Sequence, residues 1–239
     1  MCPTGFTKNN ISNDQFVPTT FPGCVMWFRA DSCLNTGTSI LYDKSGSGLT
    51  FTVASAAATL NSIDNKYNRN ATLSFASGSS QGYQNPTAGP FLTLTQPFTI
   101  IMVGNTDGSA TNQVFYDFVT NSAKLENNTS ATSVTIIAGS SLSATIASGL
   151  WANPLVVAGV FNNANGAIYI NNSQVAAASG STGTDAPSGN KMSIGVSNAG
   201  SAFLNGKIAE IIVYNNQPNN QQMQDIFAYL GMRYGIAVS

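Results

Sequence analysis

The sequence contains no histidine, which removes the side chain that most often acts as a general base near neutral pH. Ser-His-Asp and Cys-His catalytic groups are therefore excluded, and so is the commonest zinc ligand. Glutamate is also scarce, since Glu126 and Glu210 are its two occurrences. Acidic residues do not recur at alternate positions, as a pair of glycosidase carboxylates on one strand would. We therefore predict that the chain is not an enzyme and needs no cofactor.

Charge of either sign is scarce as well. Charged residues make up 8% of the 239 residues and the net charge is −1, whereas soluble chains usually carry about 25% charged residues. No basic run offers a footprint for nucleic acid, and no apolar stretch is long enough to span a membrane. The first ten residues are polar and lack the apolar core of a signal peptide. We expect a mature form, or a chain that leaves the cell by another route, such as assembly into a particle.

Cysteine is limited to Cys2, Cys24 and Cys33. The count is odd, and a chain of this length can bury a core without a disulfide. We expect thiols, although a bond between Cys24 and Cys33 stays open until their distance is known.

Short apolar segments with Gly, Asn, Ser and Pro between them fill most of the chain. Such a pattern is typical of an antiparallel sandwich. Residues 1–20 show no periodicity and are predicted to be an N-terminal arm, either lying on the domain or anchoring it to a partner; residues 21–239 are predicted to be one domain. Asn165-Gly166 and Asn171-Asn172 are expected to be hairpin turns with positive φ. Strands are expected at 25–28, 73–75, 91–94, 98–103, 114–118, 134–137, 155–161, 167–170, 191–196 and 208–214.

A single convincing helix is predicted near the C-terminus. Pro218 ends the preceding strand, Asn219 can cap the helix, and Gln222 stands three residues later as its capping-box partner. Gly235 is placed to end the helix. One apolar stripe, suited to packing on the sandwich, is formed by Met223, Ile226, Phe227 and Leu230.

Several segments resemble the laminin-G-like branch of the concanavalin A-like lectin/glucanase superfamily. They are Val25-Met26-Trp27-Phe28-Arg29-Ala30-Asp31, the Tyr42-Asp43-Lys44-Ser45-Gly46-Ser47-Gly48 loop, the Ala167–Asn171 strand, and the C-terminal pair of segments 203–214 and 229–235. The resemblance implies an all-β, antiparallel jelly-roll sandwich with one C-terminal helix. It implies a fold more than a function, because such domains occur in bacteriophage particles and in bacterial surface proteins.

Four charged residues are interpreted as structural. Asp31 and Asp43 are expected to accept backbone N–H groups in loops, with Arg29 paired to one of them. Glu210 alternates with Ile208 and Ile212 and is expected to be a carboxylate paired with a neighbour. The alternative for the loop carboxylates is a calcium site, which some laminin-G-like domains have at the rim. Nothing in the spacing brings the required oxygens together.

Glycan binding would need an aromatic platform beside amide or carboxylate groups. Tyr83, Tyr116 and Trp151 lie in or beside turn-like segments and are the candidate platform, with core packing as the alternative for each.

The leading functional hypothesis is an outer component of a virion, namely a bacteriophage decoration, head-fibre or tail protein. Its partners would be capsid or tail proteins and a host surface glycan, without nucleic acid or membrane. Self-association is left open because no coiled-coil heptad is present. The alternative is a carbohydrate-binding adhesion module, extracellular or on a cell surface.

Overall fold

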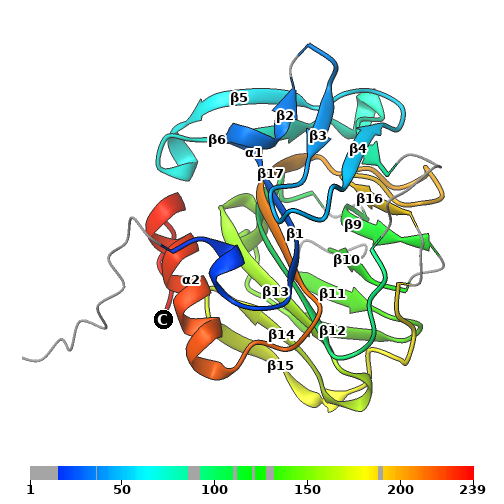
Figure 1. The fold of residues 1–239 in the computed structure, drawn as a ribbon, viewed down its shortest axis with the longest axis vertical. Coiled ribbons are helices and arrows are strands. Elements are labelled where there is room, and N and C mark those ends of the chain that lie inside the picture. The colour runs from blue at the N-terminus through cyan, green and yellow to red at the C-terminus, as the bar shows by residue number, and fades with distance from the viewer. Residues whose placement is uncertain are drawn as a thin grey trace, which may run out of the picture.

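The computed structural model describes residues 16–35, 37–85, 92–109, 112–119, 122–127, 132–187 and 191–239, with the backbone alone at 177–180. Most of the predicted arm, Cys2 and Phe91 lie outside these residues. Two antiparallel sheets pack face to face, and a C-terminal helix covers one of them (Figure 1). The predicted sandwich with one C-terminal helix is therefore confirmed.

The first sheet has eight strands, seven of them in the order β15-β14-β13-β8-β17-β6-β5. Strand β17 lies next to β6 at its beginning and next to β1 along the rest of its length. The bounds are β1 Cys24–Arg29, β5 Thr59–Asp64, β6 Asn70–Phe75, β8 Phe98–Thr106, β13 Leu155–Phe161, β14 Gly166–Ile170, β15 Ser173–Gly180 and β17 Gly206–Tyr214.

The second sheet has nine strands in the order β12-β11-β10-β9-β16-β7-β4-β3-β2. Several are only two or three residues long, which is why the sequence pattern did not show them. The bounds are β2 Leu34–Asn35, β3 Ile40–Tyr42, β4 Thr50–Val53, β7 Tyr83–Gln84, β9 Val114–Phe118, β10 Lys124–Glu126, β11 Ser133–Ile137, β12 Ser141–Thr145 and β16 Met192–Ile194.

The main core lies between the two sheets and includes side chains such as Phe28, Met102, Tyr116 and Ile136. Strands β8 and β13 are buried along their whole length, because one face meets this core and the other meets the helix. That double burial explains why both strands read as unbroken apolar runs in the sequence.

Helix α2, Asn220–Tyr234, begins and ends where the sequence predicts. The side chain of Asn219 accepts a hydrogen bond from the backbone N–H of Gln222, and the side chain of Gln222 accepts one from the backbone N–H of Asn219. Gly235 ends the helix with a φ of 68°. The helix lies against the eight-stranded sheet (Figure 1), and its apolar stripe packs on β8, β13 and β17 to form a second core cluster. No helix in the described part of the chain has the length and apolarity needed to cross a membrane.

The described end of the predicted arm lies on the domain. Phe16 is buried, with its ring centroid 5.1 Å from that of Tyr229 on α2. Tyr214 donates its hydroxyl to the carbonyl of Pro18 at 2.9 Å. Residues 16–20 thus pack beside the helix.

Three local expectations need correction. Gly166 has a φ of −64°, because the chain turns through a 3-10 segment at 163–165, where Asn163 has the positive φ. Asn171 and Asn172 do adopt positive φ, at 50° and 71°, as predicted. Residues 30–33 form a short helix, α1 (Ala30–Cys33), directly after β1, where the single predicted helix at the C-terminus left no room for another.

The third correction concerns Glu210. A β-bulge between Ile208 and Glu210 shifts the register of β17 against β8. Ile208 therefore faces the core between the sheets, whereas Ile212 faces the helix cluster. Glu210 shares the helix side with Ile212 but not with Ile208, contrary to a simple alternation.

Candidate functional site: an amide-lined groove beside the C-terminal helix

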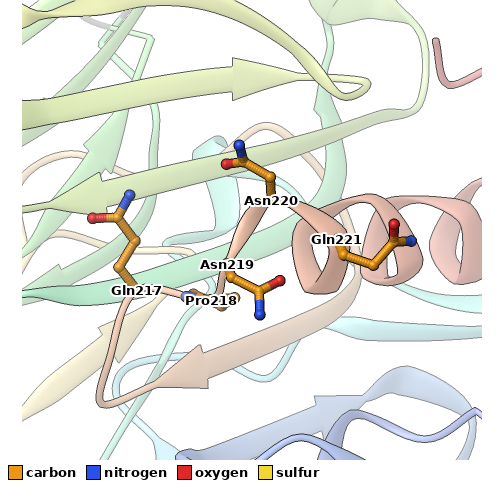
Figure 2. Close-up of a pocket in the computed structure, with 5 residues that line it drawn as sticks. All are labelled: Gln217, Pro218, Asn219, Asn220 and Gln221. Carbon is orange, nitrogen blue, oxygen red and sulfur yellow. The ribbon is translucent and has the colours of Figure 1, made fainter.

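A groove runs between the first turn of α2 and strands β13 to β15. Its deeper part encloses about 230 Å³ and continues into an open hollow at the helix start. Figure 2 shows Gln217 and Asn220 extending to one side of the chain and Asn219 to the other. The deeper part is lined by Val160, Tyr169, Asn172, Gln174, Gln217, Pro218, Asn220, Met223 and Gln224.

Amide side chains dominate the groove, and charged side chains are absent from its lining. Gln217 accepts a hydrogen bond from Asn162 at 3.2 Å, and Gln174 donates to the carbonyl of Ala176 at 3.3 Å. Each amide has two donors and two acceptor lone pairs, so both retain unused capacity. Asn220 and Gln224 are exposed. Such groups can donate to and accept from the hydroxyls of a neutral polyol.

One aromatic ring borders the groove. Tyr169, on β14, is half-buried, and its ring centroid lies 6.4 Å from that of Phe227 on α2. The packing against Phe227 fixes the ring while part of it faces the groove. Tyr169 was missed because it was interpreted simply as a member of a hairpin strand, and its place beside the amides of the helix start depends on packing between distant segments.

The predicted aromatic platform is wrong. Tyr83, Tyr116 and Trp151 each have 0% exposure and belong to the core between the sheets. Trp151 stacks on Phe115 at 4.9 Å and donates its indole N–H to the carbonyl of Ser133 at 2.6 Å. None of the three can meet a sugar, because turn-like surroundings in the sequence do not distinguish a rim residue from a core residue.

The predicted role of Asp43 is confirmed. Its carboxylate accepts the N–H groups of Trp27 at 2.7 Å, Ser45 at 3.0 Å and Ser47 at 3.1 Å. It therefore ties the loop after β3 to strand β1.

Arg29 pairs with Asp31, as predicted, at 2.6 Å. Asp31 also meets Arg233 from α2 at 2.5 Å, so two arginines and not backbone groups surround it. Burial opposes ionisation of Asp31, but the bonds and charge of Arg29 outweigh burial and lower its pKa.

Glu210 is fully buried beneath α2 and is paired, as predicted. It accepts the indole N–H of Trp27 at 2.7 Å and the hydroxyls of Tyr234 at 2.7 Å and Tyr229 at 3.2 Å. Arg233 lies 3.9 Å away. Burial is the largest influence and raises the pKa of Glu210 in spite of these donors. The carboxylate joins β1, β17 and α2, a structural role.

The cysteines and loop carboxylates offer no metal site within the described residues. Cys24 and Cys33 are both free thiols. Burial raises the pKa of Cys24 to about 12 and that of Cys33 to about 11, so both stay protonated at neutral pH.

A second polar group, on the nine-stranded sheet, was missed by the sequence reasoning. Asp117 on β9 stands opposite Lys124 on β10, and Lys124 meets Glu126 at 2.5 Å. Asp117 is 4% exposed and Glu126 is 3% exposed. The cluster joins residues of two strands, and Asp117 comes beside Lys124 only through the pairing of β9 with β10. The sequence of either strand alone therefore does not reveal it.

A separate hollow lies away from the groove, among loops that precede β5, follow β6 and follow β16. Its lining includes Ser55, Ser80, Asn198 and Phe203. Among the described residues, none of the buried side-chain atoms that lack a hydrogen-bond partner belongs to its lining, so nothing marks it as a site.

The family of the chain follows from a match to a known family model. The family model described as "Concanavalin A-like lectin/glucanases superfamily" matches residues 77–224, more than half of the chain. The chain belongs to this superfamily. No curated protein sequence matches the chain significantly.

Solved structures of similar fold include binding domains of bacterial toxins. The binding domain of botulinum neurotoxin DC in complex with SialylT has a TM-score of 0.61 at 11% identity, over 90% of this chain and 52% of that chain. The ligand-binding domain of botulinum neurotoxin serotype D in complex with N-acetylneuraminic acid has a TM-score of 0.62 at 11% identity, over 86% of this chain and 50% of that chain.

An enzyme also appears among the similar structures. Trypanosoma rangeli sialidase has a TM-score of 0.59 at 14% identity, over 89% of this chain and 33% of that chain. This chain spans about half the length of the toxin chains and a third of the sialidase. At these identities the likeness shows the fold alone.

Proposed function

We propose that the chain is a non-catalytic lectin-like domain that binds a carbohydrate in the groove between α2 and strands β13 to β15. The uncharged, amide-rich lining beside Tyr169 carries the proposal. Amides supply donors and acceptors for sugar hydroxyls, and a fixed aromatic ring supplies an apolar face for a pyranose. The complexes of similar toxin domains with SialylT and N-acetylneuraminic acid support this ligand class.

The lack of catalysis is supported by the chemistry of the carboxylates. Glu210 is enclosed by Trp27 and two tyrosines beneath the helix and cannot reach a substrate. Glu126 is held against the ammonium of Lys124. A glycosidase needs one carboxyl free to protonate the leaving group and another open to the sugar ring.

The experiment is a glycan array followed by calorimetric titration of each bound glycan. Tyr169→Ala and Asn220→Ala are expected to weaken binding at least tenfold, whereas the exposed amide variant Asn65→Ala, outside the groove, keeps wild-type affinity. Binding should change little between low and high salt, because no charged side chain lines the groove. Unchanged affinity in both groove variants would refute this site.

The location on a virion stays a prediction from the sequence. It is supported by the low charge and by the superfamily's occurrence in phage particles, and density-gradient fractionation of the native source tests it. Co-migration with a capsid protein in fixed ratio is expected; presence in soluble or envelope fractions alone would favour the cell-surface alternative.

A further inference from the structure

The cluster on the nine-stranded sheet brings one lysine and two carboxyl groups together in a buried site. The side chains of Lys124 and Glu126 are 12% and 5% exposed, and Asp117 is 4% exposed. Burial of three charges in this way is costly unless each is well paired.

The pairing in the cluster is uneven. Lys124 Nζ lies 2.5 Å from Glu126 Oε2. Asp117 Oδ2 accepts the backbone N–H of Asn198 at 2.8 Å, but the buried Asp117 Oδ1 has no hydrogen-bond partner among the described residues. A buried oxygen with no partner strongly disfavours the ionised carboxylate.

The protonation of Asp117 follows from the same surroundings. Burial is the largest influence and raises the pKa of Asp117. The N–H of Asn198 and the charge of Lys124 lower it by less, and the negative charge of Glu126 adds the smallest upward effect. These surroundings shift Asp117 towards its protonated form, which is the electrophilic form of a carboxyl group.

The register brings nucleophile and electrophile together. Lys124 and Asp117 are direct cross-strand partners, so their side chains leave the same face of the sheet. Directly opposed residues have Cβ atoms about 5 Å apart, a span that the lysine chain can cover by rotation about its terminal bonds.

We infer that Lys124 and Asp117 form an intramolecular isopeptide bond, with Glu126 as the group that transfers the protons. Glu126 takes one proton from the Lys124 ammonium, and the neutral amine attacks Asp117 Cγ. The N–C bond forms, the Cγ–Oδ1 bond breaks, and Oδ1 leaves as water with its own proton and the second proton of the amine. The proton on Glu126 passes to solvent.

The environment favours each part of that step. Glu126 lies within reach of the Lys124 ammonium and is therefore placed to accept its proton. The backbone N–H of Asn198 donates a hydrogen bond to Asp117 Oδ2, the oxygen that bears negative charge after the amine attacks. Burial excludes the water that would reverse the condensation. No oxidant or other reactant is required.

Mass spectrometry of the denatured protein tests the inference. The wild-type chain is expected to be lighter than its sequence by one water, whereas Lys124→Arg and Asp117→Ala have their full sequence masses. Glu126→Gln is expected to retain the full mass or to lose the water slowly. Lys207→Arg is the matched control, because Lys207 also pairs with an aspartate, Asp64, at 2.6 Å but lies away from the cluster. This variant should lose the water like the wild type.

Tryptic digestion gives an independent readout. Trypsin cleaves an unmodified chain after Arg69, Lys124 and Lys191, which yields the peptides 70–124 and 125–191. An acylated Lys124 is not cleaved, so the expected product is one peptide, 70–191, lighter by one water. Two separate peptides and a wild-type mass equal to the sequence mass would overturn the inference, whatever the variants do.

Discussion

Two buried carboxylate clusters occupy opposite sheets of this sandwich and differ in how completely they are paired. Beneath α2, Glu210 accepts one indole and two hydroxyl hydrogens, with a guanidinium beyond them. On the nine-stranded sheet, Asp117 keeps one oxygen without a partner and stands beside a lysine. Complete pairing holds the three elements around Glu210 together, whereas the unpaired oxygen of Asp117 calls for an explanation, which the inferred isopeptide bond supplies.

The largest effect is expected at Glu210. Glu210→Ala leaves the donors of Trp27 and Tyr234 buried without an acceptor, and we expect a loss of about 3–5 kcal/mol in the free energy of unfolding. Urea denaturation measures it. Asp225→Ala, a carboxylate change on the surface of the same helix, should cost less than about 0.5 kcal/mol. A loss at Glu210 no larger than at Asp225 would mean that the network does not hold the helix.

A smaller effect is expected at Lys124. If the isopeptide bond closes the loop from 117 to 124, Lys124→Arg should lower the free energy of unfolding by about 2 kcal/mol, from the loop-entropy relation used for disulfides. Urea midpoints of the variant and of Lys207→Arg make the comparison. Equal stability of Lys124→Arg and wild type would argue against a cross-link.

Removing one donor from the complete cluster sharpens the contrast. Tyr234→Phe keeps the ring packed against Tyr67 but removes the hydroxyl that donates to Glu210. We expect a cost of about 1–2 kcal/mol, since the acceptor is a buried carboxyl. Thermal unfolding of Tyr234→Phe beside Tyr229→Phe, whose bond is longer, should show the larger loss for Tyr234.

The smallest effect is a pH dependence. The folded-state pKa of Glu210 lies above the ordinary value of 4.5, so the folded chain holds this proton more tightly than the unfolded chain does. The stability that the folded chain gains from binding this proton is complete below pH 4.5, and it is lost as the pH rises through the raised pKa of Glu210. The stability difference between wild type and Glu210→Gln should therefore shrink as the pH rises. A difference that grows with pH would reverse the assigned direction.

Much of the fold could be predicted because its strongest signals are local. The helix was found from Asn219, Gln222 and Gly235, whose side chains or φ angles act within one turn. Strands β8 and β13 were found because burial on both faces makes them continuously apolar.

The functional residues depended on features that are not local. The Asp117–Lys124 pair exists only through strand register, and the bulge before Glu210 moves that residue to the other face of β17. Trp151 appeared to be a surface aromatic because its neighbours are turn residues, yet its ring lies in the core on Phe115. The groove itself joins segments from three strands and a helix.

The most direct test of the central claim is to map where a sugar binds. Side-chain amide resonances of the isotopically labelled protein would be followed while the glycan that binds most strongly on the array is added. The account predicts the largest shifts at Gln174, Asn220 and Gln224, with none in Tyr169→Ala at the same concentration. Largest shifts at Asn198, in the separate hollow, would contradict it.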